Sequence, residues 1–128
     1  MSFLQTLMGG AAAGGARVDT ISGETAVKFH GDADTIFVDV RSLGEIQASG
    51  TVKGAIKAPL PEFARHARPD GSGTLPASDA GKRLIMICAS GARSGVAAQQ
   101  LVNMGYADVA NLRGGIGAWF QAGGPVGR

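Results

Sequence analysis

Short apolar runs alternate with amphipathic stretches from residue 18 onward. β-Branched and aromatic residues, which are typical of strands, are concentrated in Val18 to Ile21, Thr35 to Val40 and Leu84 to Ile87. A shorter strand is expected just before Pro59, and Asp108 to Leu112 is expected to be the last strand. Because strands that alternate with helices form parallel sheets, the pattern predicts a three-layer α/β domain with a five-stranded, mainly parallel sheet flanked by helices.

Capping residues and helical spacing place the helices between these strands. Ser22 is a suitable N-cap for a helix through about His30, and Ser42 and Glu45 have capping-box spacing for a helix that ends at Gly50. Further helical faces are predicted at Leu60, Phe63, Ala64 and Ala67, at Ala97, Leu101 and Met104, and at Ile116, Trp119 and Phe120. We expect the last of these faces in the core, and a surface loop over residues 69–81.

A chain of 128 residues has the size of one domain that buries a core without disulfides. We expect residues 18–128 to form this domain and residues 1–17 to be a flexible N-terminal extension. The extension is too short and polar to span a bilayer, and no basic residue precedes Arg17, whereas a signal peptide carries positive charge before its apolar part. The prediction is a cytoplasmic protein, and the "AAAGGA" stretch keeps secretion as the alternative.

Charge and metal-ligand spacing exclude other classes of function. The net charge of +2 comes from scattered Lys and Arg residues, and only 5% of residues are aromatic, so we expect no nucleic-acid partner. One cysteine cannot form an internal disulfide or a cysteine-based zinc site, and His30 and His66 lack metal-ligand spacing. The sequence predicts no metal.

The candidate chemistry lies in "LIMICASGARSG", Leu84 to Gly95, where the only cysteine follows an apolar strand. A lone cysteine often packs as a small, inert apolar residue. However, the carboxyl ends of the strands are where ligands bind in open α/β sheets, and Cys88 lies at such an end. Both interpretations of Cys88 are open at this point.

The residues after Cys88 favour an anion site. Ala89, Ser90, Gly91 and Ala92 have no large side chain, and a helix is expected to begin near Arg93 or Ser94. Such a loop can direct successive backbone N–H groups inward, and the helix N-terminus adds its own free N–H groups. Because these groups stabilise negative charge, a thiol beside them has a lowered pKa and is present as the nucleophilic thiolate.

Several segments together resemble single-domain rhodanese-like sulfurtransferases. They cover about residues 18–126, and the set is far more specific than any one segment. The matching pieces are "FVDVR" (Phe37 to Arg41), Glu45, "SGTVKGAIKAPL" (Ser49 to Leu60), "CASGARS" (Cys88 to Ser94), "AAQQLVNMGYADVANLRGGIGAW" (Ala97 to Trp119) and "AGGPV" (Ala122 to Val126).

The resemblance implies a catalytic Cys88 that cycles through a persulfide, with no other cofactor. Thiosulfate or a low-molecular-weight persulfide would donate the sulfur, and cyanide, a thiol or a protein would accept it. The implied substrate-binding loop consists of Ala89, Ser90, Gly91, Ala92, Arg93 and Ser94, with Asp39, Arg41 and Glu45 as supporting residues. The family commonly has His where this chain has Thr51, so no histidine is assigned to the site.

Two roles stay open for the supporting charges. The Arg93 guanidinium either attracts an anionic donor or pairs with an acid such as Glu45. Asp39 and Arg41 follow a strand at the correct edge for a site, yet we expect them to form an ion-pair and capping network that holds the loop.

Other functions remain possible for the same fold. One is a phosphatase or arsenate reductase, although the phosphatase relatives of the family have five residues between Cys and Arg and this chain has four. Another is a non-catalytic binding or sulfur-sensing module. Such modules often lack the cysteine, whereas Cys88 and its full loop are present here.

Overall fold

A computed structural model of the protein describes residues 17–128. The predicted flexible extension over residues 1–17 lies, except for Arg17, outside the described residues. The domain boundary at residue 18 stays a prediction.

Seven strands form two sheets within the described residues. The larger is a five-stranded parallel sheet in the order β1-β6-β5-β2-β4, and β3 and β7 form a separate antiparallel pair. The strands are β1 (Asp19–Ile21), β2 (Thr35–Asp39), β3 (Thr51–Val52), β4 (Ile56–Lys57), β5 (Arg83–Ile87), β6 (Val109–Leu112) and β7 (Val126–Gly127). The α/β fold with a five-stranded, mainly parallel sheet is therefore confirmed.

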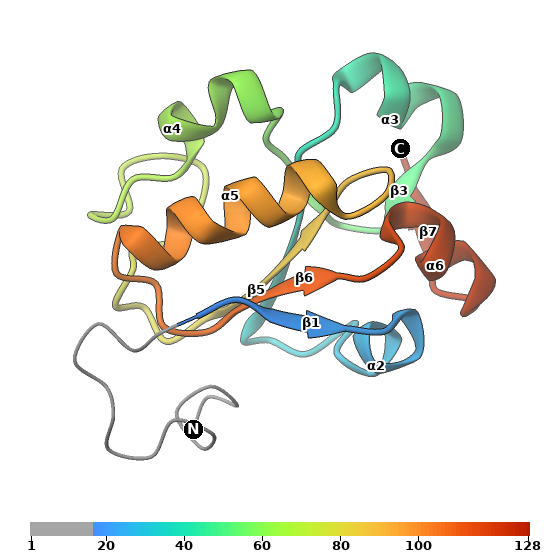
Figure 1. Ribbon diagram of the computed structural model, residues 1–128, viewed down its shortest axis with the longest axis horizontal. Coiled ribbons are helices and arrows are strands. Elements are labelled where there is room, and N and C mark those ends of the chain that lie inside the picture. The colour runs from blue at the N-terminus through green and yellow to red at the C-terminus, as the bar shows by residue number, and fades with distance from the viewer. Residues whose placement is uncertain (1–16) are drawn as a thin grey trace.

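Helices cover both faces of this sheet (Figure 1). They are α2 (Gly23–Lys28), α3 (Leu43–Ser49), the 3₁₀ helix η1 (Leu60–Glu62), α4 (Phe63–His66), α5 (Ala92–Asn103) and α6 (Gly115–Gln121). Alternate residues of β5 point to opposite faces: Leu84 and Met86 pack in the cluster that includes α4 and α5, and Ile85 and Ile87 in the cluster that includes α2 and α6. All four are fully buried, as is expected for a central strand of a parallel sheet.

The helix starts predicted at Ser22 and Ser42 are confirmed. The Ser22 hydroxyl accepts a hydrogen bond from the Thr25 N–H at 3.1 Å and caps α2. At α3 the Ser42 hydroxyl accepts from the Glu45 N–H at 3.2 Å, and Glu45 Oε1 accepts from the Ser42 N–H at 3.1 Å, which completes the capping box.

Three details differ from the sequence prediction. β6 is not the last strand, because Val126 and Gly127 form β7 against β3. The helix expected around Ala64 is a 3₁₀ turn followed by a single α-helical turn, which leaves Ala64 exposed. Trp119 is fully buried, as predicted, but Phe120 is 36% exposed, because adjacent residues of a helix point about 100° apart around its axis.

The register of the sheet brings two strand ends together. β2 and β5 run parallel, and Asp39 lies opposite Ile87. The residues that follow β5, beginning with Cys88, therefore lie at the same edge as the residues that follow β2.

Candidate active site

Cys88 lies where β5 passes into a short loop before α5. The helix begins at Ala92, slightly earlier than predicted, and Gly91 is its N-cap with φ of 108°, a left-handed conformation that favours glycine. Cys88 is fully buried, whereas Ala89, Ser90 and Ala92 around it are exposed. The thiol is thus reached only past a rim of small side chains.

Hydrogen-bond donors converge on the Cys88 sulfur. The Gly91 N–H donates to Sγ at 3.0 Å, and the Ser94 hydroxyl oxygen lies 3.3 Å from Sγ. Burial raises the pKa of the thiol, but hydrogen bonds from the Ser94 hydroxyl and from the N–H groups of Ser94, Gly91 and Ser90 outweigh it, and the pKa lies below its ordinary value. The arrangement favours a thiolate.

The backbone beneath the loop is held by α6. The Ile116 N–H donates to the Cys88 carbonyl at 2.9 Å, and Gly115, with φ of 66°, lies directly against the backbone of Cys88 and Ala89. A Cβ atom at residue 115 would overlap these backbone atoms. The close approach therefore requires glycine at position 115.

Arg93 pairs with Glu45, one of the two roles that the sequence left open. Its two terminal nitrogens donate to the two carboxylate oxygens at 2.8 and 2.9 Å. Hydrogen bonds from Arg93 and from Ser42 lower the pKa of Glu45 to about 2, and the pairing raises that of Arg93. The pair ties the first turn of α5 to α3.

Asp39 and Arg41 form the expected ion pair, but its contacts differ from the prediction. The buried guanidinium donates to Asp39 Oδ2 at 2.8 Å, to the Ser49 hydroxyl at 2.8 Å and to the Gly50 carbonyl at 2.7 Å. The Thr51 hydroxyl donates to Asp39 Oδ2 at 2.6 Å. The network holds the end of α3 and the start of β3 rather than the Cys88 loop, because both chain segments meet at the end of β2.

Asn111 is a site residue that the sequence analysis missed. Its side-chain N–H₂ donates to the Gly91 carbonyl at 2.9 Å, and its Oδ1 accepts from the Ser94 hydroxyl at 2.5 Å. The signal was one polar residue within the apolar strand "VANL", but its relation to Cys88 depends on the pairing of β5 with β6.

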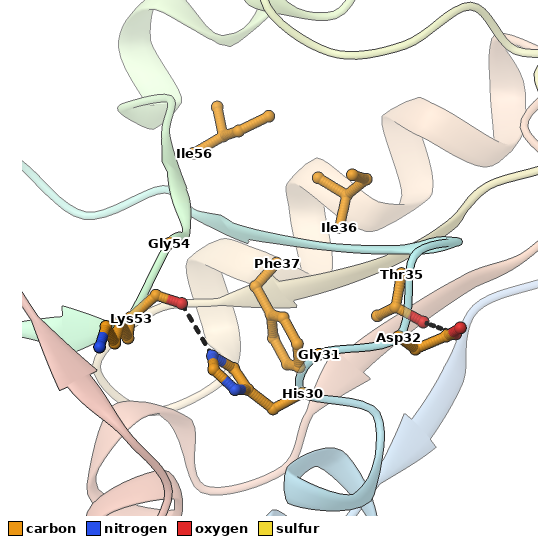
Figure 2. Close-up of a pocket in the computed structure, with 9 residues that line it drawn as sticks. All are labelled: His30, Gly31, Asp32, Thr35, Ile36, Phe37, Lys53, Gly54 and Ile56. Carbon is orange, nitrogen blue, oxygen red and sulfur yellow. Dashed lines mark hydrogen bonds between the residues drawn. The ribbon is translucent and has the colours of Figure 1, made fainter.

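A separate cavity of about 310 Å³ lies at the other end of β2. Figure 2 shows it between the start of β2 and the segment before β4, with a hydrogen bond from the His30 ring to the Lys53 carbonyl at 2.9 Å. None of the predicted site residues lines this cavity.

Residues 17–128 contain no cluster of three or more His, Cys, Asp or Glu side chains able to hold a metal ion. Among these residues, no helix combines the length and apolar character needed to cross a membrane.

A family match and a sequence relative place this chain among similar proteins. Residues 23–122 match the family described as Rhodanese-like domain. A sulfurtransferase of Allochromatium vinosum is 37% identical over 93 residues, which are 73% of this chain and 78% of that protein. These two findings support a sulfurtransferase in general terms.

Solved structures agree on the fold. A Rhodopseudomonas palustris protein of unknown function, described as a possible tyrosine phosphatase, has a TM-score of 0.77 and 31% identity over 86% of this chain and 85% of its own. A thiosulfate sulfurtransferase of Pseudomonas aeruginosa has a TM-score of 0.67 and 26% identity over 87% of this chain and 20% of its own. Because the family match spans most of the chain and includes Cys88 with its loop, the protein belongs to the rhodanese-like family.

Proposed function

We propose that the protein transfers a sulfane sulfur through a persulfide on Cys88. The observation that carries this proposal is the set of donors on one sulfur atom: the Gly91 N–H at 3.0 Å and the Ser94 hydroxyl at 3.3 Å, joined by the N–H groups of Ser90 and Ser94. Family membership and the named sulfurtransferase relative support the same chemistry.

The first half of the reaction loads the cysteine. The Cys88 thiolate attacks the outer sulfur of thiosulfate, a new S–S bond forms, and sulfite leaves with the electron pair of the bond that breaks. A low-molecular-weight persulfide donates in the same way and leaves as a thiolate. The lowered pKa of Cys88 supplies the thiolate without a histidine base.

The second half of the reaction removes the outer sulfur from the Cys88 persulfide. Cyanide or a thiolate, on a small molecule or on a protein, attacks the outer sulfur of the persulfide, and Cys88 leaves as a thiolate. The products are thiocyanate or a new persulfide. The loop N–H groups stabilise the negative charge that returns to Sγ, so the cycle needs no further cofactor.

Burial of Cys88 favours small donors. The thiol is 0% exposed, and the exposed rim carries only the short side chains of Ala89, Ser90 and Ala92. Recognition of the donor therefore depends mainly on backbone N–H groups. Arg93 adds little net charge because Glu45 pairs with it.

A phosphatase is the second candidate, because the Rhodopseudomonas structure is described as a possible tyrosine phosphatase. Two features oppose it here. Only four residues separate Cys88 from Arg93, and the guanidinium is bound to Glu45. A phosphoryl group needs a wider ring of N–H groups with the thiolate in line behind phosphorus.

One experiment separates the candidates. Thiocyanate formation from thiosulfate and cyanide is measured beside hydrolysis of an aryl phosphate, with Cys88→Ser as the control. We expect turnover of thiosulfate only, and none by Cys88→Ser. Faster hydrolysis of the phosphate would favour the phosphatase, and turnover of neither substrate would favour a non-catalytic module.

A further inference from the structure

Asn111 is a half-buried residue of β6 and lies beneath the first turn of α5. Val109, two residues earlier and on the same face of the strand, packs in the apolar cluster with residues of α5. A polar side chain at such a position is costly unless its hydrogen bonds are made. Asn111 makes one with each end of its amide, to Gly91 and to Ser94.

The orientation of this amide follows from chemistry. The Gly91 carbonyl can only accept, so it must face the N–H₂ group of Asn111, at 2.9 Å. The Asn111 oxygen then faces Ser94, and it can only accept. The 2.5 Å contact between Ser94 Oγ and Asn111 Oδ1 is therefore a hydrogen bond only while the Ser94 hydroxyl donates to Oδ1.

The Ser94 hydroxyl has two possible acceptors and one hydrogen. Its oxygen is 2.5 Å from Asn111 Oδ1 and 3.3 Å from Cys88 Sγ. While it donates to Asn111, it can only accept at the sulfur, and a thiol S–H can supply that hydrogen bond. A thiolate has no hydrogen to give and needs the hydroxyl as a donor.

We infer that Asn111 is a positioning residue that competes with Cys88 for the hydroxyl hydrogen of Ser94. With Cys88 protonated, the hydrogen bonds run from the thiol to Ser94 and from Ser94 to Asn111. When Cys88 loses its proton to solvent, the Ser94 hydroxyl turns to Sγ and Asn111 Oδ1 loses its donor. Asn111 therefore favours the thiol through Ser94, while its bond to Gly91 holds the loop.

Two ion pairs lie near the sulfur. Arg93 of α5 is paired with Glu45 of α3, and Asp39, the last residue of β2, is paired with Arg41. Glu45 has a pKa of about 2 and is ionised throughout the neutral range. Changes in the protonation of Cys88 near neutral pH can therefore be read without interference from this pair.

The test is a double-mutant cycle read by alkylation. The pH midpoint of the iodoacetamide reaction is measured for the parent protein, Asn111→Leu, Ser94→Ala and the double variant, and Cys88 is the only thiol that can react. Leucine removes the competing acceptor. We expect Asn111→Leu to lower the pH midpoint when Ser94 is present. In the Ser94→Ala background, the midpoint after Asn111→Leu should fall less, by a difference of roughly half a pH unit or more. Equal shifts in both backgrounds would overturn the inference and leave Asn111 as a loop anchor only.

A matched control and a second measurement complete the test. Gln99→Leu makes the same kind of change on the exposed face of α5 and should not move the midpoint. If Asn111→Leu does not fold, the side-chain carbonyl ¹³C shift of Asn111 is followed against pH by NMR. In the parent protein this chemical shift should change with pH as Cys88 ionises, and in Ser94→Ala the change should be much smaller. Identical pH titrations of the shift in the two proteins would contradict the inference. Neither readout uses a sulfur donor, so the inference and the proposed sulfur transfer can fail separately.

Discussion

Two polar clusters lie at the ends of neighbouring strands, at one edge of the sheet. They differ in whether their charge can change. The Asp39 cluster, made of Asp39, Arg41, Ser49 and Thr51, matches a buried carboxylate with a buried guanidinium. The Cys88 cluster, made of Cys88, Gly91, Ser94 and Asn111, directs donors at a sulfur that can hold or lose a proton.

The position alone does not separate these clusters, since Asp39 lies opposite Ile87 and both clusters begin at the carboxyl ends of parallel strands. The difference lies in their charge balance. The Asp39 cluster is neutral as a pair, whereas the donors around Cys88 stabilise a charge that no side chain there cancels. We therefore assign stability to the first cluster and reactivity to the second.

The largest effect on activity is expected from Cys88→Ser. Loss of the proposed covalent carrier should lower thiocyanate formation at least about a thousandfold. The hydroxyl can still accept from the Gly91 N–H, so the thermal midpoint should change little. Activity within tenfold of the parent protein would contradict the assignment.

The largest effect on stability is expected from Asp39→Ala. It leaves the buried Arg41 without its carboxylate and should lower the free energy of unfolding by about 3 kcal/mol or more. Urea unfolding measures this, and Asp34→Ala is the control, because the exposed Asp34–Lys82 pair should contribute less than about 1 kcal/mol. Equal losses in both variants would remove the distinction between a buried and an exposed pair.

The pH dependence tests the charge of the Cys88 cluster. Because the thiol pKa lies below its ordinary value, the rate at which thiosulfate loads Cys88, measured as sulfite released in a single turnover, should rise with pH through one ionisation whose midpoint is below roughly 8.5. The same lowering stabilises the fold above the unfolded pKa, and this contribution is lost as pH falls through the folded one. A midpoint at or above the value of a free thiol would mean that the donors do not act on Sγ.

The smallest effect is expected from Glu45→Gln. Glutamine can keep the capping box, and the pair is more than one-third exposed on both sides, so the loss of stability should be below about 1 kcal/mol. Without the carboxylate, the Arg93 charge should attract thiosulfate and lower its KM about twofold at low salt. Glu62→Gln, in a pair with Arg65, is the matched control. A raised KM would mean that Glu45 acts by orienting the loop.

The sequence was sufficient for most of the fold and for part of the site. β-Branched runs and the caps at Ser22 and Ser42 mark elements through contacts between near neighbours, so a local pattern predicts them. Cys88 and its loop lie in one continuous motif. The pairing of Arg93 with Glu45 was one of two roles that the sequence allowed, and side-chain geometry was needed to choose.

The missed features depend on partners that are distant along the chain. β7 consists of Val126 and Gly127, and only its pairing with β3 makes it a strand. Asn111 reaches Gly91 and Ser94 because β6 lies beside β5, which no local pattern shows. The same reason explains why the Asp39 cluster was expected to hold the Cys88 loop and instead holds the segment that begins β3.

The most direct test of the central claim is the intact mass of the protein after incubation with thiosulfate. Because Cys88 is the only cysteine, a gain of one sulfur atom that cyanide or a thiol removes locates the persulfide. We predict this gain in the parent protein and its absence in Cys88→Ser. An unchanged mass in the parent protein, or an equal gain in Cys88→Ser, would contradict sulfur transfer through Cys88.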